Sequence, residues 1–241
     1  MSIIKSVIFF ILILILVSCT HDDGYRVEGN RVVFEQPWNE GYGTKISELD
    51  ADVATFEVLG NDNLSWAKDK DKIWWGYMEF NNMDPSTFEA LTISVGKDKD
   101  KVICGNRIMK EANPAEFKIR TYIDKKGKKN TYGVDKHGAF LCSDYPNGYS
   151  YLSSNSIEFF QKLEDGFYKD KEKVWWGHLA LPDVKSSKFK VLSGGYATDE
   201  NHIYYHWRIV QGADLATFKV TGSMYAQDKN YRYEMERRVK R

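Results

Sequence analysis

The sequence predicts an all-β protein, built as a tandem repeat of about six units of roughly 29 residues. Three observations predict this fold. A phenylalanine recurs behind a turn-forming lead, a second motif recurs around an aspartate, and the runs between them are short and rich in β-branched and aromatic residues.

Each unit begins with an acid or amide four residues before a phenylalanine. Such a side chain suits an Asx turn or the cap of one helical turn, and Pro85 and Pro114 fit directly behind it. A strand-like segment follows the phenylalanine. The copies are Asp52 to Phe56, Asp84 to Phe88, Asn113 to Phe117, Asn155 to Phe159 and Asp214 to Phe218, with a degenerate copy ending at Phe189.

The second motif is an aromatic residue, a small residue, a spacer and an aspartate, as in Trp66-Ala-Lys-Asp69 and Tyr225-Ala-Gln-Asp228. We expect the aspartate to turn a hairpin, from which an apolar strand such as Ile73-Trp74-Trp75 leaves. Each unit then holds about three short strands. The turn aspartates are Asp69, Asp98, Asp135, Asp170, Asp199 and Asp228; three of their five spacings are 29 residues, and the others are 37 and 35.

These motifs resemble the DKNYY family, a bacterial repeat family seen here in Asp228-Lys-Asn-Tyr231 and in the stretch from Asp199 to Tyr205. The likeness covers roughly Tyr25 to Tyr233. It implies a repeat protein with no assigned activity and no functional residues to carry over. Two departures stand out: the aromatic strand becomes Ala139-Phe-Leu-Cys142, and a hairpin-like insert, 124–130, precedes it.

The first unit of the array is expected to differ from the interior units. The stretch from Tyr25 to Phe34 reads as a degenerate first copy with Glu28 in the aspartate position, which is what a cap would look like. Propeller blades typically use four strands in about forty or more residues. The shorter period therefore favours an open, solenoid-like array over a closed propeller.

The N-terminal sequence predicts that the protein is located in the cell envelope. Lys5 precedes an apolar run, Val7 to Val17, which is too short for a membrane span and reads as a signal peptide, 1–18. Leu16-Val-Ser-Cys19 resembles a bacterial lipobox, which implies a lipid on Cys19; the alternative is a plain secretory signal. Residues 19–24 form a tether. Its acidic pair Asp22-Asp23 resembles an export tag for the outer membrane surface, with an ordinary tether as the alternative.

Charge gives no support for a nucleic-acid partner. The chain has 34 Lys plus Arg against 34 Asp plus Glu. Basic clusters at Lys125 to Lys129 and from Arg232 onward, including the C-terminal tail 234–241, suit a loop tip and a chain end. The repeat domain is expected to span 25–233.

No motif predicts catalysis, a metal or a cofactor. Equivalent acids in every unit favour a structural turn role over an active site, which needs one constellation. Asp69-Lys-Asp71 and Asp98-Lys-Asp100 lack the glycine and distal glutamate of a calcium loop, and the histidines lack zinc spacing. Nucleophile-elbow, Walker and dinucleotide motifs are missing from the sequence.

The two remaining cysteines, Cys104 and Cys142, lie six and seven residues after their turn aspartates. Alternation along a strand points them to opposite faces, so we expect two free, mostly buried thiols, unless the insert shifts the register.

The strands after the turn aspartates carry two rows of apolar residues. The first row (Ile73, Trp75, Val102, Val174, Trp176, Ile203, Tyr205) is assigned to the core. A second row is either packed between units or lines an exposed strip that grips sugars or proteins. Its rings are Trp74, Phe140, Trp175, Tyr204 and Tyr233.

These observations favour a non-catalytic interaction or scaffold lipoprotein of the cell envelope, held at the membrane by its lipid, with a protein or glycan as partner. The first alternative is glycan binding through the second row. The second is an envelope enzyme with its site in the irregular segment 110–154.

Overall fold

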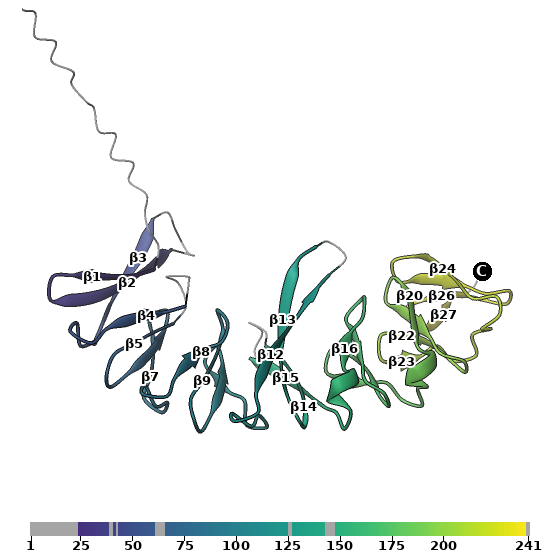
Figure 1. Cartoon of the computed structure of the whole chain (residues 1–241). Helices are drawn as coiled ribbons and strands as arrows, with labels where there is room; N and C mark the ends of the chain where they lie inside the picture. The colour runs from purple at the N-terminus through teal and green to yellow at the C-terminus, as the bar shows by residue number, and fades with distance from the viewer. Residues whose placement is uncertain are drawn as a thin grey trace, which may run out of the picture.

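The computed structural model describes residues 24–38, 41, 43–60, 66–124, 127–142 and 148–239. In these residues it shows seven small antiparallel sheets set along an open arc (Figure 1). The expected all-β repeat is confirmed, and the sheets do not close into a ring or barrel. The predicted signal peptide, 1–18, and Cys19 lie outside the described residues.

The first sheet has three strands and each later sheet has four, in chain order. Each repeat therefore has one strand more than the three we expected. The sheets are β1 (Gly24–Glu28), β2 (Arg31–Pro37) and β3 (Thr44–Leu49); β4 (Glu57–Leu59), β5 (Trp66–Lys68), β6 (Ile73–Trp75) and β7 (Met78–Phe80); β8 (Glu89–Ala90), β9 (Val95–Lys97), β10 (Val102–Cys104) and β11 (Arg107–Ile108); β12 (Lys118–Ile123), β13 (Lys129–Asp135), β14 (Gly138–Cys142) and β15 (Tyr149–Ser153); β16 (Gln161–Lys162), β17 (Phe167–Lys169), β18 (Val174–Trp176) and β19 (Leu179–Ala180); β20 (Lys190–Ser193), β21 (Tyr196–Thr198), β22 (Ile203–Tyr205) and β23 (Arg208–Ile209); β24 (Lys219–Gly222), β25 (Tyr225–Gln227), β26 (Arg232–Glu234) and β27 (Arg237–Val239).

The two ends of each sheet carry different turns. The turn aspartate joins the second and third strands at one end, here called the outer end. The turns between the first and second strands and between the third and fourth lie together at the other, inner end, where Gly105 N–H bonds Ser94 O and Gly177 N–H bonds Gly166 O. The long hairpin β12–β13 rises above its neighbours on the inner side of the arc (Figure 1).

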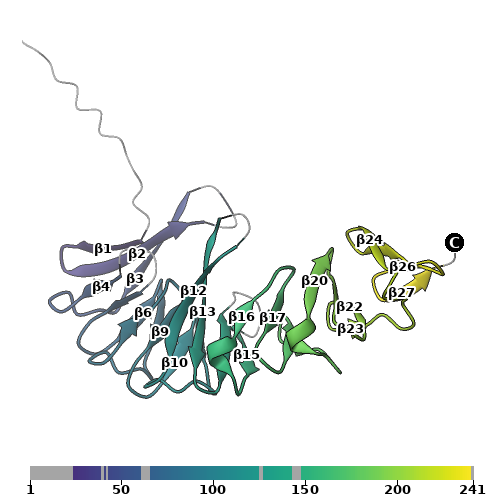
Figure 2. The same cartoon turned by 45° about the vertical axis from the view of Figure 1, so that its right-hand side comes forward.

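Successive sheets stack face to face by one rule, and Figure 2 shows the N-terminal sheets one behind another. The first-row face of one sheet packs on the second-row face of the next. Ile73 lies with Ile103, Val174 with Tyr204, and Ile203 with Tyr233. Because one such sheet cannot bury both faces alone, stacking is what gives the array its core.

The small residue of the second motif has a packing reason. A Cβ on Gly96 would lie 2.4 Å from Phe88 Cζ, and one on Gly133 would lie 2.2 Å from Phe117 Cζ. In the third and fourth sheets the phenylalanine of the first motif thus covers the small residue of the second, whereas in the fifth sheet Phe160 packs on the larger Tyr168. This contact explains why the two motifs recur together.

The first sheet fits the expected cap, and the last sheet also differs from the interior sheets. In the first sheet Glu28 pairs with Arg31 across the turn, and Val32 and Phe34 pack on Trp74 of the second sheet. In the seventh sheet the first-row positions hold exposed Arg232 and Glu234 in place of apolar residues. Residues 237–239, assigned above to a tail, form β27.

One copy of the first motif is shifted by a residue. The buried ring is Phe160, whereas Phe159 is exposed. The short 3-10 turn (Ile157–Phe159) begins after Ser156, so Ser156 and not Asn155 takes the lead position. Across the described part of the chain, no helix is long and apolar enough to cross a membrane.

Candidate functional site

The turn aspartates form a repeated clamp at the outer ends of the sheets. Asp98 Oδ1 accepts the N–H groups of Asp100 and Lys101 at 2.8 and 2.6 Å, and Oδ2 accepts the N–H of Asp84 at 2.8 Å. One carboxylate therefore closes its own hairpin and also holds the lead residue of the first motif. Asp69, Asp135, Asp199 and Asp228 make the same three kinds of bond, and all are buried.

Asp170 reaches the shifted copy through a hydroxyl. Ser154 Oγ donates to Asp170 Oδ2 at 2.6 Å and accepts the N–H of Ser156 at 3.1 Å. Oδ1 of Asp170 still accepts the amides of its own turn, from Glu172 and Lys173. The serine hydroxyl thus replaces the direct bond made in the other units.

Two of the clamps gain a tyrosine. The hydroxyl groups of Tyr204 and Tyr233 donate to Oδ2 of Asp199 and Asp228 at 3.2 and 2.8 Å. Burial would raise the pKa of Asp228, but the bonds from the Asp214 amide, the Tyr233 hydroxyl and its own turn outweigh it and lower the pKa to about 2. Burial and the bond to Asp228 raise the pKa of Tyr233 to about 12. The carboxylates of Asp199 and Asp228 are therefore engaged in hydrogen bonds within the repeat.

Exposed ion pairs lie beside the clamps, at the outer ends of the sheets. The lysine after the turn aspartate pairs with the acid that leads the first motif: Lys70 with Asp52, Lys99 with Asp84, and Lys229 with Asp214. In the sixth sheet both signs are reversed, since Glu200 follows Asp199 and pairs with Lys185 at 3.1 Å. The exchange shows that opposite charge matters at this contact more than which partner carries it.

The second aromatic row does not line a surface. Trp74, Phe140, Trp175, Tyr204 and Tyr233 are each at most 3% exposed. Their faces are covered by the first-row face of the preceding sheet, as with Trp74 in the cluster of Val32 and Phe34. Of the two alternatives for these rings, the structure has the packing between units and not the exposed, ligand-facing strip. The glycan alternative therefore loses the residues on which it depended.

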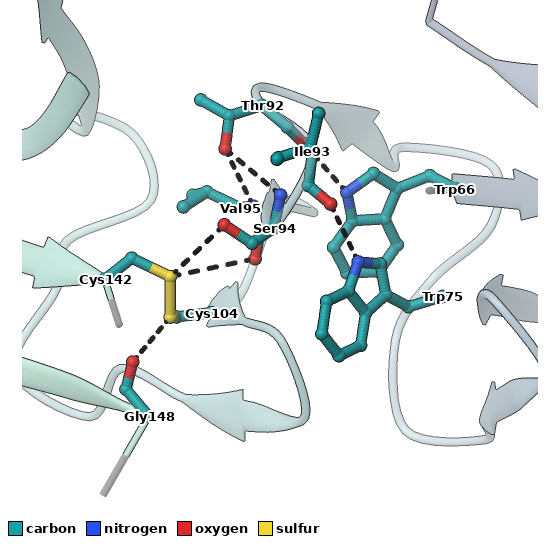
Figure 3. Close-up of a disulfide and its surroundings, with 9 residues drawn as sticks. All are labelled: Trp66, Trp75, Thr92, Ile93, Ser94, Val95, Cys104, Cys142 and Gly148. Atoms are coloured by element: carbon teal, nitrogen blue, oxygen red, sulfur yellow. Dashed lines mark hydrogen bonds between the residues drawn. A yellow bond between two sulfur atoms is a disulfide. The ribbon is translucent and has the colours of Figure 1, made fainter. Parts of the chain in front are cut away.

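Cys104 and Cys142 form a disulfide between the third and fourth sheets, with 5.8 Å between their Cα atoms (Figure 3). The prediction of two free thiols is wrong. The cysteines do lie on opposite faces of their own sheets, but opposite faces of successive sheets meet in the stack. Val102 and Phe140 show this directly, because both pack in the cluster that contains Cys104.

The turn 91–94 at the inner end of the third sheet joins three sheets. The indole N–H groups of Trp66 and Trp75, in the second sheet, donate to the carbonyl oxygens of Thr92 and Ile93 at 2.9 and 2.7 Å (Figure 3). Ser94 Oγ lies 3.5 Å from Cys142 Sγ in the fourth sheet. This turn therefore connects the inner ends of the second, third and fourth sheets.

Exposed apolar side chains gather at the inner ends of the sheets. We call them the inner rim: Trp38, Tyr77, Ile93, Ile123, Leu192, Met224, Tyr225 and Met235. Ile93 and Ile123 are the most exposed, at 67% and 73%. Fewer exposed apolar residues lie at the outer ends, namely Val27, Phe159, Leu215 and Tyr231, and two more, Ile46 and Val58, lie within strands. Sequence reasoning missed the rim because its members lie in turns and at strand ends, where no apolar pattern repeats. Tyr225 belongs to the second motif, but it lies in the last described sheet and is 48% exposed.

The segment proposed for an enzyme site is regular. Residues 110–154 contain β12, β13, β14 and β15, although 125, 126 and 143–147 lie outside the described residues. Two hollows lie beside the hairpin. The described lining of one, of about 340 Å³, includes Lys129, Tyr122 and Tyr168 but no carboxylate and no histidine. The lining of the other, of about 720 Å³, includes Asp124, Glu164 and Asp165. Among the described residues, no cluster of three metal-ligating side chains occurs.

A sequence model described as the DKNYY family matches residues 66–237. The chain belongs to the DKNYY family. The match covers six of the seven sheets and begins at Trp66, inside the second. No curated protein and no solved structure matches this DKNYY protein.

The DKNYY match includes all six turn aspartates, and the first sheet, with Glu28, precedes it. In this DKNYY protein the aspartates that open the repeated motif hold hairpins and lead residues together. The inner rim lies partly in the matched region, from Tyr77 to Met235.

Proposed function

We propose that this DKNYY protein is a non-catalytic interaction or scaffold module of the cell envelope, and that its partner binds the inner rim. The observation that carries the proposal is the distribution of exposed apolar side chains. Stacking buries both faces of the interior sheets, and eight of the fourteen exposed large apolar residues in the described chain lie at the inner ends. Exposed apolar patches mark contact sites, and repeat arrays bind partners on extended concave surfaces.

The envelope address is part of the proposal. The lipobox-like residues before Cys19 favour a lipid anchor, and the Cys104–Cys142 disulfide supports an oxidising compartment. A Cys19→Ser variant should leave the membrane fraction and lose label from a fatty-acid probe. A variant that keeps both the label and the membrane location would contradict the anchor at this residue.

The interaction is tested with two double variants, one on the inner rim and one at the outer ends of the sheets. Tyr77→Ser with Ile93→Ser alters the inner rim, and Phe159→Ser with Leu215→Ser removes exposed apolar groups from the outer ends. Cross-linking in intact envelopes, followed by affinity capture, should recover a reproducible protein partner for the wild type and the outer variant, and lose it for the inner one. Equal loss in both variants, or turnover of a substrate by pure protein with no partner recovered, would overturn the proposal.

A further inference from the structure

The fourth sheet has an edge strand unlike the others. β12 is six residues long, whereas the first strands of the other four-stranded sheets have two to four residues. It ends the strand order of its sheet, so no described strand pairs with its outward side. Edge strands are templates for pairing with another chain, and proteins usually keep them short.

The register shows which backbone groups face outward. Asp124 N–H bonds Lys128 O at the hairpin turn, and Tyr122 lies opposite Asn130. Because bonded and non-bonded pairs alternate along an antiparallel ladder, the N–H and C=O groups of Ile119, Thr121 and Ile123 point away from β13. Thr121 and Ile123 are exposed.

The sequence of this edge is complementary to itself. We propose that β12 pairs antiparallel with β12 of a second copy, with Thr121 on the two-fold axis. That register places Lys118 opposite Asp124, Ile119 opposite Ile123, Arg120 opposite Tyr122, and Thr121 opposite Thr121 of the second copy. Within its own chain Arg120 also donates to Ile157 O at 2.8 Å.

The register with Arg120 on the two-fold axis fits less well. A slip that brings Arg120 opposite Arg120 of the second copy places like charges together, which destabilises a cross-strand pair. The two-fold operation also reverses the strand direction, so the two arcs curve in opposite directions and diverge on either side of the fourth sheet. The contact is therefore small, and the dimer should be concentration-dependent.

The test uses the purified full chain in analytical ultracentrifugation. Wild type should dimerise reversibly. Thr121→Pro should be monomeric yet folded, because the lost N–H points outward and proline is tolerated there on an edge strand. Lys118→Glu, which sets an acid against Asp124 twice per dimer, should weaken association roughly ten-fold.

A cysteine variant tests the register. Thr121→Cys should oxidise to a disulfide that joins residue 121 of both copies, identified by peptide mapping, since bonded pairs lie within disulfide range. Ser193→Cys, on the edge strand β20, is the matched control and should not cross-link. A wild type that stays monomeric at the highest soluble concentration, or a dimer unaffected by both Thr121→Pro and Lys118→Glu, would overturn the proposal.

Discussion

The carboxylate of Asp98 accepts the backbone N–H of Asp84, fourteen residues earlier in the chain, at 2.8 Å. Through this bond the hairpin turn of a sheet holds the short turn that precedes the same sheet. Five of the six turn aspartates make such a bond directly, and Asp170 makes it through Ser154. A buried aspartate carboxylate that accepts backbone hydrogen bonds is thus as regular a feature of the repeat as its aromatic core.

Removing one clamp should be costly. Asp98→Ala leaves the amides of Asp84, Asp100 and Lys101 without their acceptor, and we expect a loss of about 3 kcal/mol in the free energy of unfolding. The exposed Asp100→Ala should change it by less than about 0.5 kcal/mol. Urea denaturation measures both, and equal effects would contradict the clamp.

The clamp should also weaken in acid. The pKa of Asp228 is about 2 in the folded protein and lies near 3.8 when the group is free. Its ionised form therefore stabilises the fold fully above pH 3.8, and that contribution is lost as the pH falls through about 2. Denaturation of wild type and Asp228→Asn from pH 7 downward should show a stability difference that narrows in this range. A constant difference would argue against a lowered pKa.

The contact between the two motifs can be tested by a double-mutant cycle. Gly133→Ala places a Cβ against the Phe117 ring, and overpacking of this kind costs about 1–3 kcal/mol. Phe117→Leu should reduce the cost of Gly133→Ala, although Phe117→Leu alone also destabilises. Additive effects in thermal unfolding would show that the ring does not press on this position.

The disulfide should contribute measurably to stability. Closing a separation of 38 residues is worth about 4 kcal/mol in the chain-entropy model. Reduction, or replacement of Cys104 and Cys142 by serine, should lower the free energy of unfolding by up to that amount. Thiol titration of the oxidised protein under denaturing conditions should find neither cysteine reactive, and detection of both would contradict the bond.

Several features follow from the sequence because they repeat. The all-β class, the position of each turn aspartate and the alternation of two apolar rows are all local patterns, so they could be predicted. The fourth strand of each unit could not, because segments such as Leu179–Ala180 and Arg208–Ile209 are only two residues long and carry no alternation.

Relationships between units were harder to predict. Alternation places Trp74 and Trp75 on opposite faces of the second sheet. It does not predict that the first sheet covers Trp74 and that the third sheet packs against Trp75. Because alternation within a strand does not show which faces of successive sheets meet, the prediction for Cys104 and Cys142 was also wrong. Phe159 and Phe160 are adjacent aromatics, and only the hydroxyl of Ser154 bridging Ser156 and Asp170 explains why the second one is buried.

The central claim is that successive sheets stack through the second aromatic row and leave the inner rim exposed. Hydroxyl-radical footprinting of the purified, oxidised protein, read by mass spectrometry, tests it directly. Trp74 and Trp175 should be protected, while Trp38 and Tyr77, which are 47% and 46% exposed, should be labelled rapidly. Labelling of Trp74 or Trp175 at the rate of Trp38 would contradict the stacked array.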